Sequence, residues 1–242
     1  MNEYKIDELS VFFPCYNEEN NIKNTVSKAI NILKKVAKKW EIILINDGSK
    51  DNTGEVIEKI KLENPNEIKI ITHNPNRGYG AALKSGLYNS KYKWIVFSDS
   101  DGQFDFGEIT KFIDKQKESK SDIVIGYYLS RQVSKVTILT SKIWEIFVFI
   151  LFGLKVTDID CGFKLINKKV IETIPKLEAE RGAFISSEFL IKSKKAGFKI
   201  TELGVHHYPR VEGKATGRNI KVIIKSFSDL FSLWYKINFK RV

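Results

Sequence analysis

The chain has 242 residues, of which 43% are hydrophobic and 29% charged, a balance that excludes disordered and fibrous proteins. That length suits one α/β domain, or one domain with a short appendage. The net charge of +11 favours an anionic partner, such as a nucleotide, a nucleic acid or a membrane surface. Two cysteines and three histidines build neither a disulfide scaffold nor a four-ligand zinc site, so we expect a reducing compartment.

The sequence shows no targeting or membrane-spanning segment. Residues 1–8 are polar and lack the apolar stretch of a signal peptide. The longest apolar run, residues 143–154, contains Glu145 and is shorter than the roughly 20 residues that a bilayer span needs. We therefore expect a cytoplasmic protein that is at most peripheral on the cytoplasmic face of a membrane.

The first hundred residues alternate apolar runs with amphipathic stretches. Strands are predicted at residues 9–13, 41–45, 68–72 and 94–98, and helices at 21–39, 51–62 and 80–88. This alternation predicts parallel strands joined by right-handed crossovers. Sheets of this kind bind ligands in the loops at the carboxyl ends of their strands.

The second half of the chain is less regular. It contains a predicted helix at 106–117, a strand at 122–126, a strongly apolar helix at 135–152 and a loop at 155–162. A strand at 163–166, a helix at 186–195 and a strand at 199–205 follow. An amphipathic helix at 219–239 ends the chain, with Lys221, Lys225, Lys236 and Lys240 available to lipid headgroups. We divide the chain into a domain at 1–217 and this tail at 218–242.

The first four predicted strands all lead into polar loops. These loops begin with Pro14, Asn46, Asn74 and Ser98 respectively. One polar strand end commonly serves as a helix cap or turn, and we assign Asp51 to that role. Four such ends at one edge of a sheet indicate a ligand site.

Asp99 and Asp101 form an Asp-x-Asp pair after a strand that is predicted to be buried. Residues two apart in an extended chain point to the same side, where two carboxylates repel unless a cation or proton neutralises them. Oxygen ligands suit Mg²⁺ or Mn²⁺, which accept their remaining ligands from substrate phosphates. The glycines at 78 and 80 lack the third glycine of a dinucleotide fingerprint and are read as a turn, beside which Arg77 and Lys84 can face a phosphate.

Six segments together resemble one family. They are FPCYNE at 13–18, NDGS at 46–49, NRG at 76–78, DSDGQ at 99–103, DIDCGFKL at 158–165 and HHYPR at 206–210. The chain resembles inverting glycosyltransferase family two, which has the GT-A fold, a mostly parallel α/β sheet flanked by helices. Within that family it is most similar to dolichyl-phosphate mannose synthases and related polyprenyl-phosphate glycosyltransferases. Cys15 stands where alanine is commoner, and Asn46 stands where many members have aspartate.

The resemblance implies a role for each matching residue. The nucleotide-sugar donor would be bound by Pro14, Tyr16, Asn17, Glu18, Asn46, Asp47, Gly48, Arg77, Lys84 and Asp99. Asp101 and Gln103 would hold the Mg²⁺ or Mn²⁺ ion. The acceptor phosphate would meet Arg131, Arg210 and Lys214, with His206 and His207 shaping that loop. Asp99, Asp101, Arg131, Arg210 and Asp158 are the candidate catalytic residues.

The implied reaction moves a hexose, with inversion, from a nucleotide-diphosphate sugar to a polyprenyl or dolichyl phosphate. GDP-mannose is the first choice of donor and UDP-glucose the second. A phosphate acceptor is already anionic, whereas a sugar hydroxyl would need a base, for which Asp158 or Asp160 is available. The lipid acceptor also implies a membrane surface, with Trp144, Phe147, Phe227, Phe231 and Trp234 as anchors.

Other classes stay open at this point. A basic membrane or nucleic-acid binder without catalysis would explain the charge, but it would not need the Asp99/Asp101 pair. The aromatic residues lie in apolar runs rather than among basic residues on a strand, which argues against nucleic acid as a partner. A sugar nucleotidyltransferase is the nearest enzymatic rival, but its glycine-rich basic N-terminal loop is absent from the sequence. The oligomeric state is not predicted.

Overall fold

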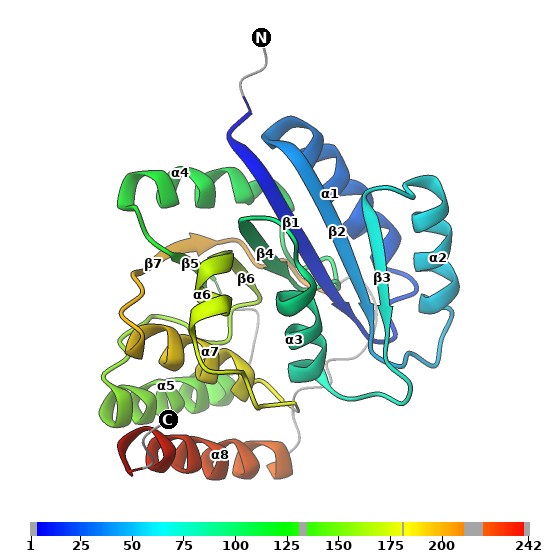
Figure 1. Ribbon diagram of the computed structural model, residues 1–242. Helices are drawn as coiled ribbons and strands as arrows, with labels where there is room; N and C mark the ends of the chain where they lie inside the picture. Colours follow the sequence, from blue (N-terminus) through cyan, green and yellow to red (C-terminus); the bar gives the residue numbers. More distant parts are fainter. Residues whose placement is uncertain (1–3, 131–134, 181, 211–219, 240–242) are drawn as a thin grey trace.

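A computed structural model describes residues 4–130, 135–180, 182–210 and 220–239 of the chain. Its centre is a seven-stranded sheet with the order β3-β2-β1-β4-β6-β5-β7 (Figure 1). The strands are β1 Ile6–Cys15, β2 Ala37–Asn46, β3 Ile68–Thr72, β4 Trp94–Ser98, β5 Ile123–Tyr128, β6 Phe163–Asn167 and β7 Ile200–Val205. β6 runs antiparallel to its neighbours β4 and β5, and the other pairs are parallel. The predicted mostly parallel α/β sheet is therefore confirmed.

Helices cover both faces of this sheet. They are α1 Ile22–Val36, α2 Thr53–Glu63, α3 Tyr79–Asn89, the short 3-10 helix η1 Phe106–Glu108, α4 Ile109–Ser119, α5 Lys135–Phe152, α6 Lys168–Thr173, α7 Phe184–Lys195 and α8 Ile220–Phe239. Strand residues alternate between the faces, so Val11 and Phe13 pack against α1, α2 and α4, whereas Phe12 packs on the other side against α3 and α7. The burial of both faces explains why the central strands are nearly continuous apolar runs.

The predicted elements are mostly present, with shifted ends. The largest shift lies at the border between the first helix and β2, because the helix ends at Val36 and not at residue 39, and the strand was predicted to begin only at residue 41. β2 begins directly at Ala37, because Ala37 and Lys39 pair with Ile6 and Glu8 of β1. Both β1 and β2 thus begin several residues before the apolar runs from which they were predicted. Their pairing turns residues 37–39, which were assigned to the helix, into the start of a strand. The short helix α6 was not predicted.

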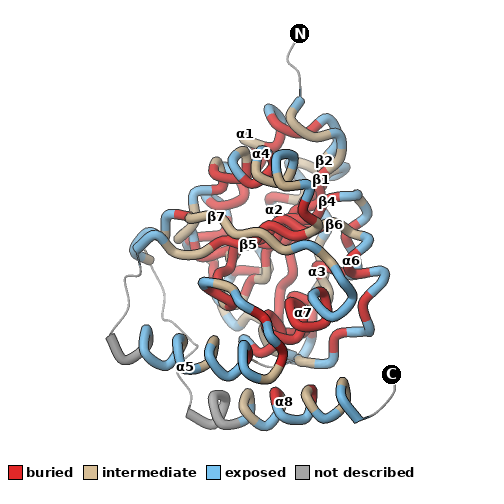
Figure 2. The backbone as a smooth tube through the Cα atoms, turned by 90° about the vertical axis from the view of Figure 1, so that its left-hand side faces the viewer, coloured by how far each residue is buried: buried red, intermediate tan, exposed pale blue. Residues whose placement is uncertain are grey.

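Helices α5 and α8 lie together at one end of the molecule, beyond α7, with much of their outer surface exposed (Figures 1 and 2). The ring of Trp144 on α5 packs against Phe227 of α8 at 5.0 Å between centroids, and its Nε1 donates to Ser187 Oγ of α7. Leu230 and Leu233 of α8 are buried in the core on this side of the sheet. Within the described ranges, no helix has both the length and the hydropathy to cross a bilayer.

Both cysteines are buried and unpaired. Cys15 ends β1, and Cys161 lies in the loop before β6. Burial raises the pKa of each thiol to about 12. The thiols therefore remain protonated at neutral pH and act as small core side chains, not as nucleophiles.

Candidate active site

The polar loops after β1, β2, β3 and β4 meet at the carboxyl edge of the parallel strands. Backbone hydrogen bonds join the strand ends, from Asp47 N to Cys15 O and from His73 N to Asn46 O, both 2.9 Å. The hydroxyl of Ser100 donates to Pro14 O at 2.6 Å and thereby fixes the fourth loop to the first. The sequence prediction that these loops form one cluster is therefore correct for the structure.

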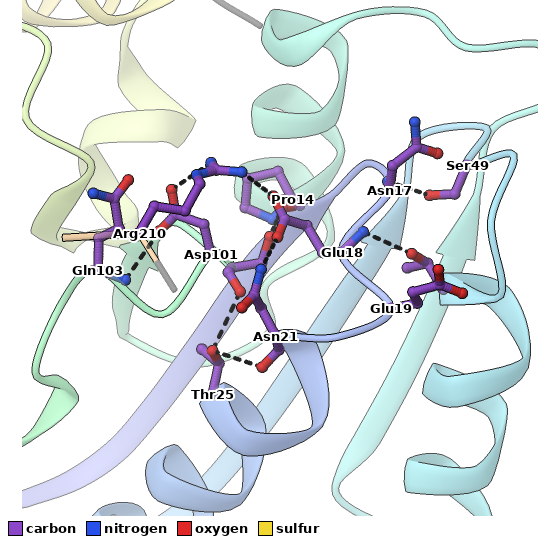
Figure 3. A network of polar contacts seen from close by, with 12 residues as sticks. Pro14, Asn17, Glu18, Glu19, Asn21, Thr25, Ser49, Asp101, Gln103 and Arg210 are labelled. Atoms are coloured by element: carbon purple, nitrogen blue, oxygen red, sulfur yellow. Dashed lines mark hydrogen bonds and ion pairs between the residues drawn. The ribbon is translucent and has the colours of Figure 1, made fainter. Parts of the chain in front are cut away.

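Arg210 connects two carboxylates from different loops of this cluster (Figure 3). Its Nη2 donates to Asp101 Oδ2 at 2.7 Å, and its Nη1 donates to Glu18 Oε1 at 3.2 Å. Glu18 and Asp101 are both buried residues. Burial raises the pKa of Glu18, against the lowering effects of Asn21 and Arg210, and the charge of Asp101 adds to the rise. The guanidinium thus neutralises a buried acidic pair that would otherwise repel.

The segment that carries Arg210 is fixed to the loop beyond Asp101. Tyr208 N donates to Gln103 O at 2.9 Å, and Gln103 Nε2 donates back to Tyr208 O at 2.8 Å. Glu108 accepts from His206 N at 2.9 Å and contacts His206 Nδ1 at 3.0 Å. We call residues 206–210 the strap. The structure gives the Gln103 side chain an anchoring role on the strap, and its role as a metal ligand stays a prediction.

Asp99 has different surroundings from Asp101, although the two were expected to share one side of the chain. Its Oδ1 accepts from Tyr79 OH at 3.1 Å, and its carboxylate lies against the backbone of Gly162. Burial, and secondly the charge of Asp101, raises the pKa of Asp99 to about 7. The charge of Asp101 is thus neutralised by Arg210, whereas Asp99 readily takes up a proton. The sequence predicted that the repulsion between the two carboxylates would be relieved by a cation or by a proton, and both occur here.

The pKa of Asp99 gives a testable dependence of stability on pH. Because this pKa is raised from 3.8 to about 7, the folded state holds a proton that the unfolded state has lost between these values. The free energy of unfolding therefore falls as pH rises through this window. Asp99→Asn should remove that loss and raise Tm by a few °C at pH 8, since ~1 kcal/mol shifts Tm by about 2–4 °C in a domain of this size, with little change near pH 4.

Thermal unfolding of the metal-free protein at pH 4.5, 6 and 8 measures this effect. Asp114→Asn is a matched control, because that carboxylate is exposed and pairs with Lys5 at the surface. A gain for Asp99→Asn that is equal at all three pH values would contradict the assignment.

Asp47 organises the loops after β2 and β3. Its two carboxylate oxygens accept from Asn76 Nδ2 at 2.8 Å, Arg77 N at 3.0 Å and Gly78 N at 2.8 Å, and Oδ1 also contacts His73 Nδ1 at 2.6 Å. His73 Nε2 in turn contacts Ser85 Oγ of α3 at 2.9 Å. Asp47, predicted to bind the donor, thus holds the loop at 73–78 in place. Sequence reasoning missed His73, although it is the first polar residue after β3 and so carried the same signal as the other strand ends.

The other predicted donor residues lie in the same loops. Asn17 Oδ1 accepts from Lys50 N at 2.8 Å, and Asn46 Oδ1 accepts from Ser49 N at 3.0 Å. Gly48 has φ +68°, and a Cβ there would lie 2.6 Å from Asn76 N, so only glycine fits this turn. Pro14, Tyr16 and Asn17 are at least partly exposed at the same edge. Asp51, expected to be a helix cap, lies one residue before the N-cap Asn52 of α2, and its Oδ1 accepts from Thr53 N at 3.0 Å.

The two predicted donor cations on the third loop pair with one carboxylate. Arg77 and Lys84 contact Glu180 Oε1 at 3.0 and 3.1 Å. Glu180 belongs to the segment after α6, whose backbone approaches α3 so closely that a Cβ on Gly80 would lie 2.9 Å from Glu180 O. Both cations are therefore near the cluster, but they are neutralised in this structure.

Asp158 was a candidate base and is buried in the loop before β6. Its Oδ1 accepts from Asp160 N at 3.0 Å and Cys161 N at 3.1 Å. These bonds favour the alternative interpretation, in which Asp158 orders the loop before Gly162. Arg131 and Lys214, predicted to meet the acceptor phosphate, lie outside the described residues.

The donor set at Asp101 fits a divalent cation that shares its ligands with a substrate. Among the described residues, no three His, Cys, Asp or Glu side chains are grouped as a metal site. Mg²⁺ bound with nucleotides usually takes one or two protein carboxylates, with phosphate oxygens and water as the other ligands. Asp101 provides such a carboxylate, and its Oδ2 already accepts from the positively charged guanidinium of Arg210 at 2.7 Å.

Comparison with known proteins agrees with this geometry. The family model described as "Glycosyl transferase family 2" matches residues 10–174. The dolichyl-phosphate beta-glucosyltransferase of Saccharomyces cerevisiae is 32% identical, over 85% of this chain and 69% of that protein. The undecaprenyl-phosphate 4-deoxy-4-formamido-L-arabinose transferase of Salmonella choleraesuis is 29% identical, over 96% of this chain and 67% of that protein.

Solved structures show the same architecture. Glucosyl-3-phosphoglycerate synthase from Mycobacterium tuberculosis, in complex with Mn²⁺ and uridine-diphosphate-glucose, superposes with a TM-score of 0.68. The two chains are 16% identical, over 95% of this chain and 78% of the other, so the likeness concerns the fold. Because the family model matches most of the sequence and the yeast relative covers most of both chains, this protein belongs to glycosyl transferase family 2 and has the GT-A fold.

Proposed function

We propose that this glycosyltransferase moves glucose, with inversion, from UDP-glucose to a polyprenyl phosphate. The observation that carries the proposal is the cationic contact on Asp101, where Arg210 joins the donor loops to the strap at the carboxyl edge of the sheet. The yeast and Salmonella relatives are both named as transferases of a sugar to a lipid phosphate. The sugar is glucose in the first name and a formamido-arabinose in the second. GDP-mannose, the first choice from sequence, becomes the alternative donor.

On the donor side, the loops after β1 and β2 would hold the nucleoside. Asp101 would hold Mg²⁺ or Mn²⁺ together with the diphosphate, and the ion would neutralise the charge that develops on the departing nucleotide. Asp47 would act through the loop at 73–78, which it holds with four contacts. Asp99 would face the sugar beside Tyr79, whose hydroxyl keeps its proton because burial raises the pKa of Tyr79 well above 10.

On the acceptor side, a lipid phosphate needs no general base. This agrees with Asp158, whose Oδ1 is engaged by two backbone N–H groups of its own loop. Arg210, together with Arg131 and Lys214, would orient the phosphate, because guanidinium groups bind phosphate oxygens bidentately. A sugar-hydroxyl acceptor would instead require one of the carboxylates of this loop as the base.

A transfer assay tests the function. The purified protein is incubated with radiolabelled UDP-glucose or GDP-mannose, a short-chain polyprenyl phosphate, and Mn²⁺, Mg²⁺ or EDTA. We expect a glucosylated lipid that forms with either ion and disappears with EDTA. Transfer only to free sugars would reject the lipid acceptor, and salt-sensitive RNA binding without any transfer would reject the enzyme.

Arg210→Ala should lower transfer to the lipid phosphate about 10²-fold or more, the usual cost of removing one group that stabilises developing charge. The affinity for UDP should change only a few-fold, because we assign the guanidinium to the acceptor phosphate and it contacts the donor loops through the side chains of Glu18 and Asp101. Initial rates and UDP titrations measure the two effects. A proportional collapse of UDP affinity would place Arg210 in the diphosphate site instead.

The tail and α5 would bring the enzyme to the membrane. Their exposed large apolar residues, which we call the apolar face, are Ile138, Leu139, Ile143, Ile146, Phe147, Phe149 and Ile150 of α5 and Phe231, Tyr235 and Phe239 of α8. Lys142 and Lys225 are exposed and Lys236 is half-buried; all three lie on the same helices and suit anionic lipid. Of the anchors predicted from sequence, Phe147 and Phe231 are exposed, whereas Trp144 and Phe227 pack against each other. Trp234 is partly buried against the core and is not a free anchor.

Substitution on the apolar face tests membrane binding. Leu139→Glu/Ile150→Glu should reduce flotation with anionic vesicles several-fold, since each buried methylene contributes about 0.8 kcal/mol. Leu62→Glu is the control, because Leu62 is also exposed but lies on α2. Equal flotation of all three proteins would remove the apolar face from the proposal.

We also propose that residues 218–242 belong to the same folding unit as residues 1–217. The supporting observation is that Leu230 and Leu233 of α8 are buried in the core shared with α7. The predicted boundary itself falls among residues that the structure does not describe.

A further inference from the structure

The contact between Arg210 and the acidic pair has a regular pattern (Figure 3). Each carboxylate has one oxygen bonded within its own loop, Glu18 Oε2 to Asn21 Nδ2 at 2.8 Å and Asp101 Oδ1 to Gln103 N at 3.1 Å. The other oxygen of each carboxylate accepts from Arg210. Arg210 therefore binds the oxygen of each carboxylate that is not used in these loop hydrogen bonds, and these are the oxygens most available to an added cation.

A divalent cation and the guanidinium would repel each other if both were bound to one of these oxygens. Mg²⁺ lies about 2.1 Å from a carboxylate oxygen. The Nη2 atom of Arg210 lies 2.7 Å from Asp101 Oδ2, so both cations on this oxygen would be in strong repulsion at short range. Binding of either one therefore weakens binding of the other.

Arg210 can leave without unfolding the segment that carries it. The strap is held by Gln103 and Glu108 through His206 and Tyr208, and none of these bonds involves the guanidinium. The side chain of Arg210 is also 24% exposed, so it has space to rotate toward solvent. Release thus needs a change in one side chain.

We propose that Arg210 and a divalent cation compete for Asp101 Oδ2, so that loading of the ion releases the guanidinium toward the acceptor phosphate. This inference rests on the proposed function, because it assigns the released arginine to the acceptor. In the free enzyme Arg210 holds the acidic pair neutral and lowers its affinity for cations. Once the ion and the donor are bound, the freed guanidinium becomes a binding site for an anion, and the donor therefore binds before the acceptor.

Binding of Mn²⁺ alone tests the competition without any turnover. Free Mn²⁺ is measured by electron paramagnetic resonance at low ionic strength, without nucleotide, for the wild type and Arg210→Ala. Arg210→Ala should bind Mn²⁺ about fivefold more tightly or better, the lower end of typical coupling between two ligands. Arg210→Lys, which keeps the charge, should stay close to the wild type.

Two further variants locate the effect. The double variant Arg210→Ala/Asp101→Asn should lose the gain, because the competing oxygen no longer carries a charge. Lys115→Ala removes one positive charge from α4, where Lys115 pairs with Glu118, and should leave the affinity within about twofold, as expected for an exposed ion pair.

The outcomes separate this inference from the proposed function. Equal or weaker Mn²⁺ binding by Arg210→Ala would overturn the competition, and so would a gain that persists in the double variant. If the wild type meanwhile transfers glucose to the lipid phosphate, only the competition fails. Tighter Mn²⁺ binding in a protein that transfers no sugar would support the competition for Asp101 and reject the proposed function.

Discussion

Asp101→Asn is expected to lower sugar transfer at least ~10³-fold, because it removes the carboxylate that we propose holds the metal ion in place of Arg210. The amide oxygen can still accept from Gln103 N, which donates to Asp101 Oδ1 at 3.1 Å, so the loop should keep its shape. Initial rates with saturating UDP-glucose and Mn²⁺ measure the loss, and circular dichroism checks the fold.

The stability of this variant should not increase. Considered as one of two repelling carboxylates, Asp101 would destabilise the ligand-free protein, and its removal would raise Tm. The structure pairs Asp101 with Arg210 at 2.7 Å, so Asp101→Asn leaves a guanidinium with one partner fewer, and we expect Tm to stay the same or to fall.

Asp105→Asn is the matched control for Asp101→Asn. Asp105 lies in the same loop, but its carboxylate accepts from Gly107 N at 2.8 Å at the start of η1. We expect near-normal transfer from this variant. Near-normal turnover by folded Asp101→Asn would reject Asp101 as the metal ligand.

The sequence was sufficient to predict the alternating strands and helices of the first half of the chain, although not all of their ends. The third and fourth strands and α5 have the predicted limits, because their apolar runs are bounded by polar residues or turn residues on both sides. The direction of β6 could not be predicted in this way. Its short run, FKLIN, carries no mark of direction, and its antiparallel pairing with β4 and β5 depends on the path of the chain through α5.

The sequence also placed the site at the strand ends, but not its internal contacts. Glu18 and Arg210 are 192 positions apart, and no local pattern shows that they pair. The roles of Asp47 and Asp99 also depend on tertiary contacts, with His73 in one case and Gly162 in the other. Residue type and position after a strand thus locate a polar cluster, whereas its partners depend on how the loops pack.

Gly162→Ala is the second substitution with a large expected effect. A Cβ at this position would lie 2.0 Å from Asp99 Oδ2 and 2.6 Å from its Cγ, far inside any real contact. The side chain of Asp99 cannot move away freely, because its other oxygen accepts from Tyr79 OH. The backbone of Asp99 is also held, since its N donates to Gly162 O at 3.2 Å. We expect a loss of ~1–3 kcal/mol in stability and, because Asp99 is displaced, transfer reduced about 10²-fold or more.

A double variant distinguishes displacement of Asp99 from general damage to the loop. In Gly162→Ala/Asp99→Ala the clashing carboxylate is gone, so Tm should recover relative to Gly162→Ala, although transfer stays low. Gly54→Ala on α2 is the control, since its Cβ would meet only Asn46 Nδ2 at 3.2 Å. If the double variant is no more stable than Gly162→Ala, the clash lies elsewhere. If Gly162→Ala transfers sugar normally, transfer does not depend on the position of the Asp99 carboxylate against residue 162. The glycine would then be required for packing only.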